Sequence, residues 1–109
     1  MKEIKAYIKA IKLNDVTKAL HEIEGLDGAS ISEVQGFGRG KANSGNYSHD
    51  RNPSGLVKHL KLEVVCQDEL EETIVDAIHR AAHTGHRGDG KIYVSDISKS
   101  VRIQTLDTQ

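Results

Sequence analysis

The chain has 109 residues, a formal net charge of −1 and one cysteine. This charge excludes the basic excess that general nucleic-acid binding needs, and the single cysteine excludes a disulfide within the chain and favours a reducing compartment. Because no signal peptide and no run of about 20 apolar residues is present, we expect one cytoplasmic domain over residues 1–109, without direct membrane insertion.

The first third of the chain predicts a strand, a helix and a second strand. In "EIKAYIKAIK" apolar and polar residues alternate as in a half-buried strand, whose apolar face holds Ile4, Ala6, Ile8 and Ala10. The segment "LNDVTKALHEIEG" has apolar residues at helical spacing, with Asn14 as the expected N-cap. The period of a strand returns in "ASISEVQGF".

Residues 36–55, "GFGRGKANSGNYSHDRNPSG", interrupt every period. They hold five of the ten glycines and the only proline. Loops beyond about 12–15 residues are uncommon in compact domains and are usually functional or disordered. We therefore expect a long functional loop here.

The second half repeats the order of the first. Leu60, Leu62 and Val64 share one face of a strand in "LVKHLKLEVVC". The segment "DELEETIVDAIHRAAHTG" predicts a helix that Asp68 caps, with Glu71 as the partner of a capping box. The last two segments, "KIYVSDI" and "SVRIQT", are expected strands.

Two such halves predict an α+β fold, the ferredoxin-like double βαβ sandwich. In this fold two helices cover one face of an antiparallel sheet. The opposite face needs a cover, and self-association of the chain is the simplest one.

The stretch "HTGHRGDGKIYVSDI" has the chemistry of an anion site. Gly88 and Gly90 permit backbone angles at which peptide N–H groups point inward together, and Lys91 adds a positive charge. Asp89 can turn the loop or accept a hydrogen bond from a hydroxyl. The alternative is a plain helix-to-strand turn without a ligand.

A second glycine-rich segment, "GFGRGK" at residues 36–41, strengthens the first interpretation. It also follows a strand and presents bare backbone beside Arg39 and Lys41. The spacing is not that of a Walker loop. Two such segments at corresponding ends of one sheet fit a polyphosphate better than either does alone.

These segments resemble a known family. The stretches "IKAIKLNDV", "SEVQGFGRGK", "KLEVV", "HTGHRGDGKIYVSDI" and "VRIQT" are similar, in order and separation, to the PII signalling family, the nitrogen regulatory proteins P-II. The resemblance implies a homotrimeric regulator, not an enzyme, that binds ATP or ADP between subunits. It further implies a T-loop, at residues of about 38–56, that docks on a membrane transporter or a nitrogen-metabolism enzyme.

The resemblance also implies which residues meet the ligand and the partner. The expected phosphate contacts are Gly36, Gly38, Arg39, Gly88, Asp89, Gly90 and Lys91, with Arg102 reaching in from the neighbouring subunit. Ser30 and Val65 stand where the family contacts the base. The expected partner contacts in the T-loop are Lys41, Tyr47, His49 and Arg51.

Several positions depart from the family pattern and indicate a divergent member. Gly40 replaces a glutamine that helps to hold magnesium and 2-oxoglutarate, so 2-oxoglutarate is a doubtful effector, while magnesium remains a candidate. Asn52 replaces a tyrosine that some members have modified, which argues against uridylylation. Gln104 replaces a second arginine, which weakens the case for a third phosphate and favours ADP or AMP. His59 stands near a family lysine implicated in effector binding.

The histidines allow an alternative function, a metal-responsive module on the same scaffold. His79 and His83 have the i, i+4 spacing that lets two imidazoles on one helix face bind zinc or a similar transition-metal ion, with Asp76, His86 or a residue of a neighbouring subunit as the third ligand. A solvated helix face is the simpler interpretation. Cys66 ends an apolar strand and is expected in the core, although the helix start nearby leaves redox sensitivity open.

Overall fold

The computed structural model describes residues 1–37 and 55–105. Its elements in chain order are β1 (Lys2–Ile8), the 3-10 helix η1 (Ala10–Lys12), α1 (Leu13–His21), β2 (Ser30–Gly36), β3 (Val57–Cys66), the 3-10 helix η2 (Asp68–Leu70), α3 (Glu71–Ala82) and β4 (Lys91–Asp96). The strands form one antiparallel sheet in the order β2-β3-β1-β4. The predicted ferredoxin-like fold class is confirmed.

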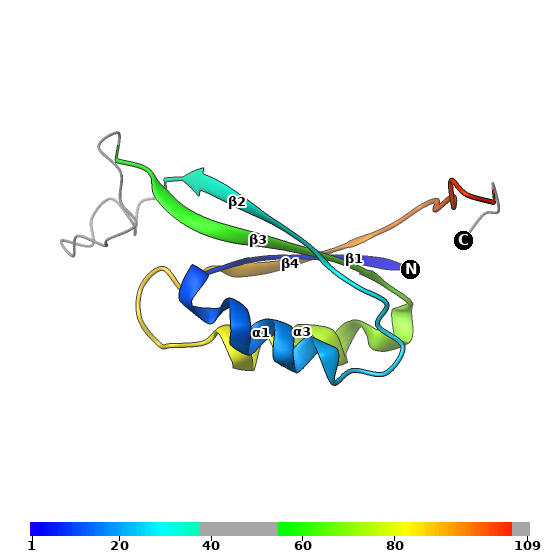
Figure 1. The fold of residues 1–109 in the computed structure, drawn as a ribbon, viewed down its shortest axis with the longest axis horizontal. Helices are drawn as coiled ribbons and strands as arrows, with labels where there is room; N and C mark the ends of the chain where they lie inside the picture. The colour runs from blue at the N-terminus through cyan, green and yellow to red at the C-terminus, as the bar shows by residue number, and fades with distance from the viewer. Residues whose placement is uncertain (38–54, 106–109) are drawn as a thin grey trace.

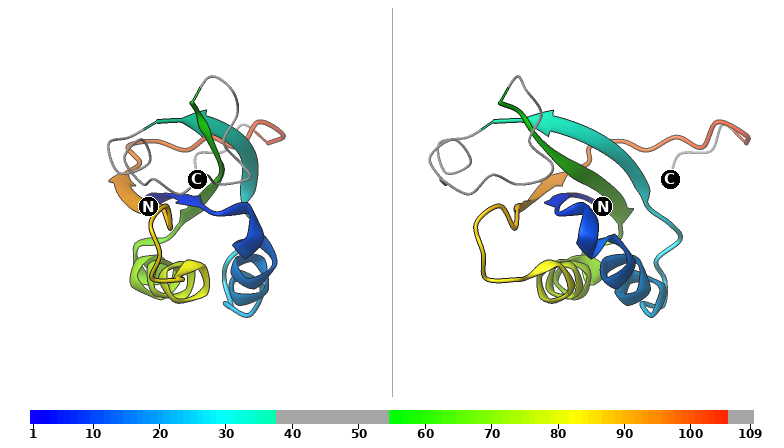
Figure 2. Two further views of the ribbon diagram at one scale, coloured as in Figure 1. Left: turned by 90° about the vertical axis from the view of Figure 1, so that its left-hand side faces the viewer. Right: turned by 60° about the vertical axis from the view of Figure 1, so that its left-hand side comes forward.

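Both helices lie on the same face of the sheet, and the opposite face has no layer over it among the described residues (Figures 1 and 2). The helices also pack against each other. Alternate residues of the strands point toward them, which is why the period of two in the sequence marks the core. The fully buried side chains at the centre are Ile4, Ile8, Val16, Leu62, Val64, Ile74 and Ile78.

The register of the sheet explains the composition of its open face. Ala6 pairs with Leu62 on the helix side, so the neighbouring residues Lys5 and Tyr7 project to the open side. There the ring of Tyr7 meets the ring of Tyr93 edge to face, with 6.1 Å between the centroids. Tyr93 keeps 53% of its surface exposed in the single chain. Tyr7 is half-buried, and an exposed aromatic ring such as that of Tyr93 on an uncovered sheet face is typical of a face that another molecule covers.

The predicted helix starts are wrong at both helices. Asn14 does not cap α1, because the chain enters that helix through the 3-10 turn η1 and no side chain caps it. Asp68 likewise does not cap α3. Its carboxylate accepts a hydrogen bond from the amino group of Met1 at 2.6 Å, and this bond holds the pKa of Asp68 below its usual value.

Two predicted strand limits also need correction. β1 ends at Ile8, and Ala10 is an exposed residue of η1 rather than part of the apolar strand face. The predicted strand "SVRIQT" is absent from the described residues, where only a single bridge residue at Val101 and a turn follow β4. This segment extends away from the sheet (Figure 1), and Ile103 is 89% exposed, so the single chain offers it no strand to pair with.

Candidate functional site

The two glycine-rich segments lie at the same end of the sheet but at opposite edges. Gly36 ends β2 and Lys91 begins β4, and the long loop and the connection from α3 to β4 meet the sheet at that end (Figure 1). β3 and β1 separate these two edge strands. Three inter-strand spacings correspond to roughly 14 Å. This separation applies to Gly36, while residues 38–41 of the second segment lie outside the described residues.

The loop of residues 83–90 is organised around the carboxylate of Asp89. One oxygen accepts hydrogen bonds from the backbone N–H groups of Thr84 and Gly85, each at 2.9 Å, and the other accepts one from the Thr84 hydroxyl. The ammonium group of Lys9 lies 3.3 Å from the same carboxylate. Asp89 thus accepts from a hydroxyl and turns the loop, as the sequence predicted, and its carboxylate has little capacity left for a ligand.

These contacts change the ionisation of Asp89. Burial alone would raise its pKa, but the hydrogen bonds from Thr84, Gly85 and Lys9 outweigh burial and hold the pKa far below the usual value. Asp89 therefore stays ionised throughout the neutral and mildly acidic range. It fixes the loop as a permanent anion paired with Lys9.

The glycines of the loop meet two different requirements. Gly88 and Gly90 have φ of +84° and +103°, a region that L-residues with side chains rarely adopt. A Cβ on Gly90 would also lie only 1.7 Å from the carbonyl oxygen of Tyr7. Gly90 therefore lets the loop close against β1, whereas a Cβ on Gly88 would meet only the Lys9 side chain, at 3.7 Å.

The loop presents unused hydrogen-bond donors. In residues 1–37 and 55–105, no hydrogen bond of the structure uses the backbone N–H groups of Gly88, Asp89 or Gly90. Alternating positive-φ glycines direct such groups into a concavity that suits an oxyanion. Lys91 is exposed at the following position and adds a cation. This arrangement can bind a phosphate group.

The remaining predicted ligand contacts lie at the other end of the sheet. Ser30 begins β2 and pairs with Glu63, and Val65 pairs with Glu3 near the start of β1. The rise of β2 separates Ser30 from Gly36 by roughly 20 Å. Arg102 follows β4 at this far end, in the segment that leaves the sheet (Figure 1). A site that uses both groups of residues therefore needs two chains.

The predicted site did not include three residues that shape the loop. Lys9 and Thr84 contact Asp89, and their side chains also lie 3.3 Å apart. His59 on β3 is 5% exposed and places its Nε2 atom 2.8 Å from the carbonyl oxygen of Gly88. The sequence patterns placed Lys9 inside the first strand and Thr84 inside the second helix, whereas both lie beyond the ends of these elements. Only the paired strands bring either of them, or His59, to the loop.

A hollow of about 350 Å³ lies beneath the loop on the helix side. Its walls come from α3, from the adjoining ends of β1 and β4, and from the loop: Tyr7, Ile8, Val75, Ile78, His79, Ala82, His83, Asp89, Gly90, Lys91 and Ile92. Three predicted site residues, 89–91, therefore border both this largely apolar hollow and the unused amides.

The structure does not support the predicted metal site. α3 ends at Ala82, and the extended backbone of His83 takes it off the helix face of His79. The two rings meet edge to face with 6.4 Å between centroids, and His86 is exposed in the loop. No group of three histidine, cysteine or carboxylate side chains able to hold a metal ion exists among the described residues.

Cys66 is buried in the core as expected. Burial raises the pKa of its thiol, and Glu71 adds to this effect. The helix start nearby therefore does not activate the thiol, and redox sensitivity is not favoured.

Two predicted phosphate contacts and the four predicted partner contacts lie outside the described residues. This applies to Gly38, Arg39, Lys41, Tyr47, His49 and Arg51. None of the helices in the described ranges has the length and apolar composition that crossing a bilayer requires.

Comparison with known proteins shows the family of the chain. The family model described as "Nitrogen regulatory protein P-II" matches residues 1–107. The nitrogen regulatory protein P-II of Azospirillum brasilense is 44% identical over 105 residues, which cover 96% of this chain and 93% of that protein. That of Rhizobium meliloti is 43% identical over 99% of this chain and 96% of its own length. Nitrogen regulatory protein P-II 1 of Escherichia coli K12 is 43% identical over 96% and 93%.

Proposed function

The chain belongs to the nitrogen regulatory protein P-II family of signalling proteins, which are not enzymes, and we propose that it binds an adenine nucleotide between the subunits of a homotrimer. ADP and ATP are the expected ligands, with AMP as a further candidate and magnesium as an accompanying ion. Proteins of this family act as trimers that regulate partner proteins. Trimer formation and nucleotide binding by this chain are proposals.

The unused backbone donors of residues 88–90 are the observation that carries the proposal. Gly88 and Asp89 are half-buried, and N–H groups in such positions are usually paired, so two successive unpaired ones in an ordered loop indicate a ligand; the N–H of the exposed Gly90 is open to solvent or to the same ligand. Asp89 and Lys9 neutralise each other inside the loop. The amides and Lys91 therefore remain to meet the negative charge of a phosphate.

The separation of the predicted contacts supports a site between subunits. The loop lies at one end of the sheet, and Ser30, Val65 and Arg102 lie at the other. A neighbouring copy that places its far end beside the loop would supply a base pocket and a second cation. Such assembly would also cover the open face of the sheet, and the burial of apolar surface there, including that of Tyr93, would stabilise the trimer.

We propose that nucleotide occupancy is reported to a partner protein through the T-loop. The loop emerges at Phe37 and returns at Gly55, at the same end of the sheet as the 83–90 loop. A ligand bound there lies at the base of the T-loop and can bias its conformation. A membrane transporter or a nitrogen-metabolism enzyme is the proposed partner.

Calorimetric titration of the purified protein with ATP, ADP and AMP tests the nucleotide part. We expect saturable binding of one nucleotide per chain, and a solution mass three times the 12.0 kDa of one chain. Absence of heat at tens of micromolar ligand, with the trimer intact, would contradict nucleotide binding. A monomeric mass would contradict a site between subunits.

A further inference from the structure

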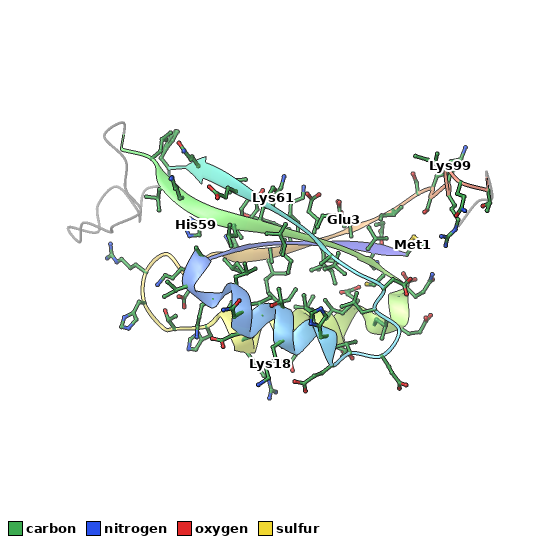
Figure 3. All side chains as sticks on the ribbon, in the orientation of Figure 1. Met1, Glu3, Lys18, His59, Lys61 and Lys99 are labelled. Carbon is green, nitrogen blue, oxygen red and sulfur yellow. The ribbon has the colours of Figure 1, made fainter. Side chains whose placement is uncertain are left out.

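His59 is a buried polar residue at the end of the sheet that holds the 83–90 loop (Figure 3). It pairs with Val34 on β2, and it lies one residue beyond the last pair of β1 with β3, Ile8 with Leu60. Its side chain can therefore pass the end of β1 and reach the carbonyl oxygen of Gly88, 2.8 Å from Nε2. Because a carbonyl oxygen only accepts, Nε2 carries the proton in this contact.

This hydrogen bond orients the peptide group on which the anion site depends. The structure has no cis peptide bonds, so the C=O and N–H of the Gly88–Asp89 peptide point in opposite directions. When His59 holds the Gly88 carbonyl, the N–H of Asp89 must point away from β3. That N–H is one of the unused donors of the loop. His59 therefore fixes the direction of a donor that it does not itself touch.

The second ring nitrogen of His59 is unsatisfied. Nδ1 is buried and has no hydrogen-bond partner within residues 1–37 and 55–105. With the proton on Nε2, a neutral imidazole presents a lone pair at Nδ1. A buried nitrogen without a partner costs free energy, and such a group calls for a functional explanation. Nδ1 is a position where one proton can be taken up.

The charges around His59 determine when that proton binds. Lys9, just beyond the end of β1, is paired with Asp89, and Lys12 of η1 is paired with Asp15. On β3 itself, Lys61 lies two residues along on the same face and is paired with Glu63 at 3.7 Å. Val34, the partner on β2, does not titrate.

The loop adds further titratable groups near the Gly88 carbonyl. Arg87 and His86 are exposed, and His83 lies 3.8 Å from the Asp89 carboxylate. The carboxylates described here therefore already have cationic partners. A phosphate bound at the loop would add uncompensated negative charge, which favours a protonated imidazole.

We propose that His59 is a positioning residue of the nucleotide site and takes up a proton when a nucleotide phosphate binds; this inference rests on the proposed function. Nε2–H holds the Gly88 carbonyl in both protonation states. Nδ1 gains the proton, so the imidazolium balances part of the phosphate charge. By linkage, the nucleotide affinity of the native chain is higher at pH 6.0 than at pH 8.0 relative to a variant without the imidazole.

Two variants separate these roles. His59→Gln keeps an N–H donor for the Gly88 carbonyl but does not titrate, and His59→Leu removes both functions at similar volume. ADP titrations at pH 6.0 and 8.0 would compare the full-length variants with the native chain. Ionisation of ADP and of the exposed histidines is common to all three proteins, so it cancels in the ratio of their affinities.

We expect the ratio of native to His59→Gln affinity to be about threefold or more larger at pH 6.0 than at pH 8.0. Repeating the titrations in buffers of different ionisation enthalpy should give more protons taken up per ADP by the native chain than by His59→Gln. His59→Leu should bind about tenfold more weakly than His59→Gln at both pH values, as expected for one lost orienting hydrogen bond.

Each outcome bears on a distinct claim. If the native chain binds no nucleotide, the proposed function fails and this inference fails with it. If the native chain binds but shares its pH profile and proton uptake with His59→Gln, the role of His59 is refuted while the proposed function stands. Should His59→Leu fail to fold, the comparison of the native chain with His59→Gln still decides between these results.

Discussion

Gly90 lies so close to the backbone of Tyr7 that it accommodates no side chain. A Cβ would stand 1.7 Å from the Tyr7 oxygen, and φ is +103°. Backbone strain of this kind costs about 1–3 kcal/mol before any overlap is relieved. We therefore predict that Gly90→Ala lowers the free energy of unfolding by more than about 2 kcal/mol in urea titrations.

Gly36→Ala is the matched control for this prediction. No atom lies within 4 Å of a Cβ at Gly36, and its φ lies outside the left-handed region. Its free energy of unfolding should stay within about 0.5 kcal/mol of that of the native chain. Equal stability of the two variants would mean that the loop does not close against β1 as described.

Asp89 makes a stability contribution that depends on pH. Its folded-state pKa lies below the unfolded value of about 3.9, so the ionised form stabilises the fold in full above that value and the contribution is lost as the pH falls through the folded pKa. We predict that Asp89→Asn costs about 1–3 kcal/mol at pH 7. The cost should shrink as the pH is lowered below about 4.

Urea titrations at several pH values measure this difference. Asp27→Asn is a suitable control, because Asp27 is exposed and forms no ion pair among the described residues. If Asp89→Asn were as stable as the native chain at pH 7, or if its deficit persisted unchanged to pH 3, the carboxylate would not organise the loop.

At the level of single residues, the sequence predicted the backbone conformation and the role of loop residues better than it predicted which side chains contact the loop. The positive-φ glycines at 88 and 90 and the turning role of Asp89 followed from residue type alone. The resemblance placed His59 near an effector-binding position, but the contacts of Lys9, Thr84 and His59 with the loop could not be predicted, because they depend on the register of β1 and β3.

At the level of the elements, hydrophobic periodicity located every strand of the sheet and both α-helices. Local sequence did not predict correctly where the two helices begin. Leu13 begins α1 after a 3-10 turn, and Asp68 contacts the amino terminus instead of capping α3. Polar residues at helix starts have several partners available, and local sequence does not select among them. The predicted last strand failed since strands need a neighbour, which the single chain does not offer.

The 83–90 loop allows a prediction on binding. Gly88→Val should abolish nucleotide binding, because the valine side chain would lie beside the unused amides. Residue 88 has a φ of +84°, which a residue with a side chain rarely adopts. The strain costs about 1–3 kcal/mol, less than the stability of an ordinary domain. The variant should therefore remain folded and trimeric in calorimetry and mass measurements.

Gly25→Val is the control that separates the effect of backbone strain on stability from a direct effect on nucleotide binding. Gly25 has a similar φ of +89° but follows α1, away from the 83–90 loop, and its Cβ would meet only the Leu70 side chain, at 3.3 Å. That variant should lose comparable stability and still bind nucleotide. Unchanged affinity in Gly88→Val would place the ligand elsewhere.

At the level of the whole molecule, the length of the paired strands divides the predicted site in two. The loop lies at one end of the sheet, and Ser30, Val65 and Arg102 lie at the other. The resemblance supplied the expectation that Arg102 acts from a neighbouring subunit. Residue types and spacing alone could not separate the two groups, because only the paired strands give their distance.

The most direct test of a site shared between chains is complementation of two inactive variants. Gly88→Val blocks phosphate binding by the 83–90 loop, and Arg102→Ala removes the cation expected from the neighbouring subunit. Neither homotrimer should therefore bind ADP well. When equal amounts of both chains are assembled together, about one quarter of the sites (one half of one half) combine an intact loop with an intact arginine. We expect calorimetry to recover about that fraction of the native ADP sites; mixed trimers that bind no ADP would show that the two residues do not share a site between chains.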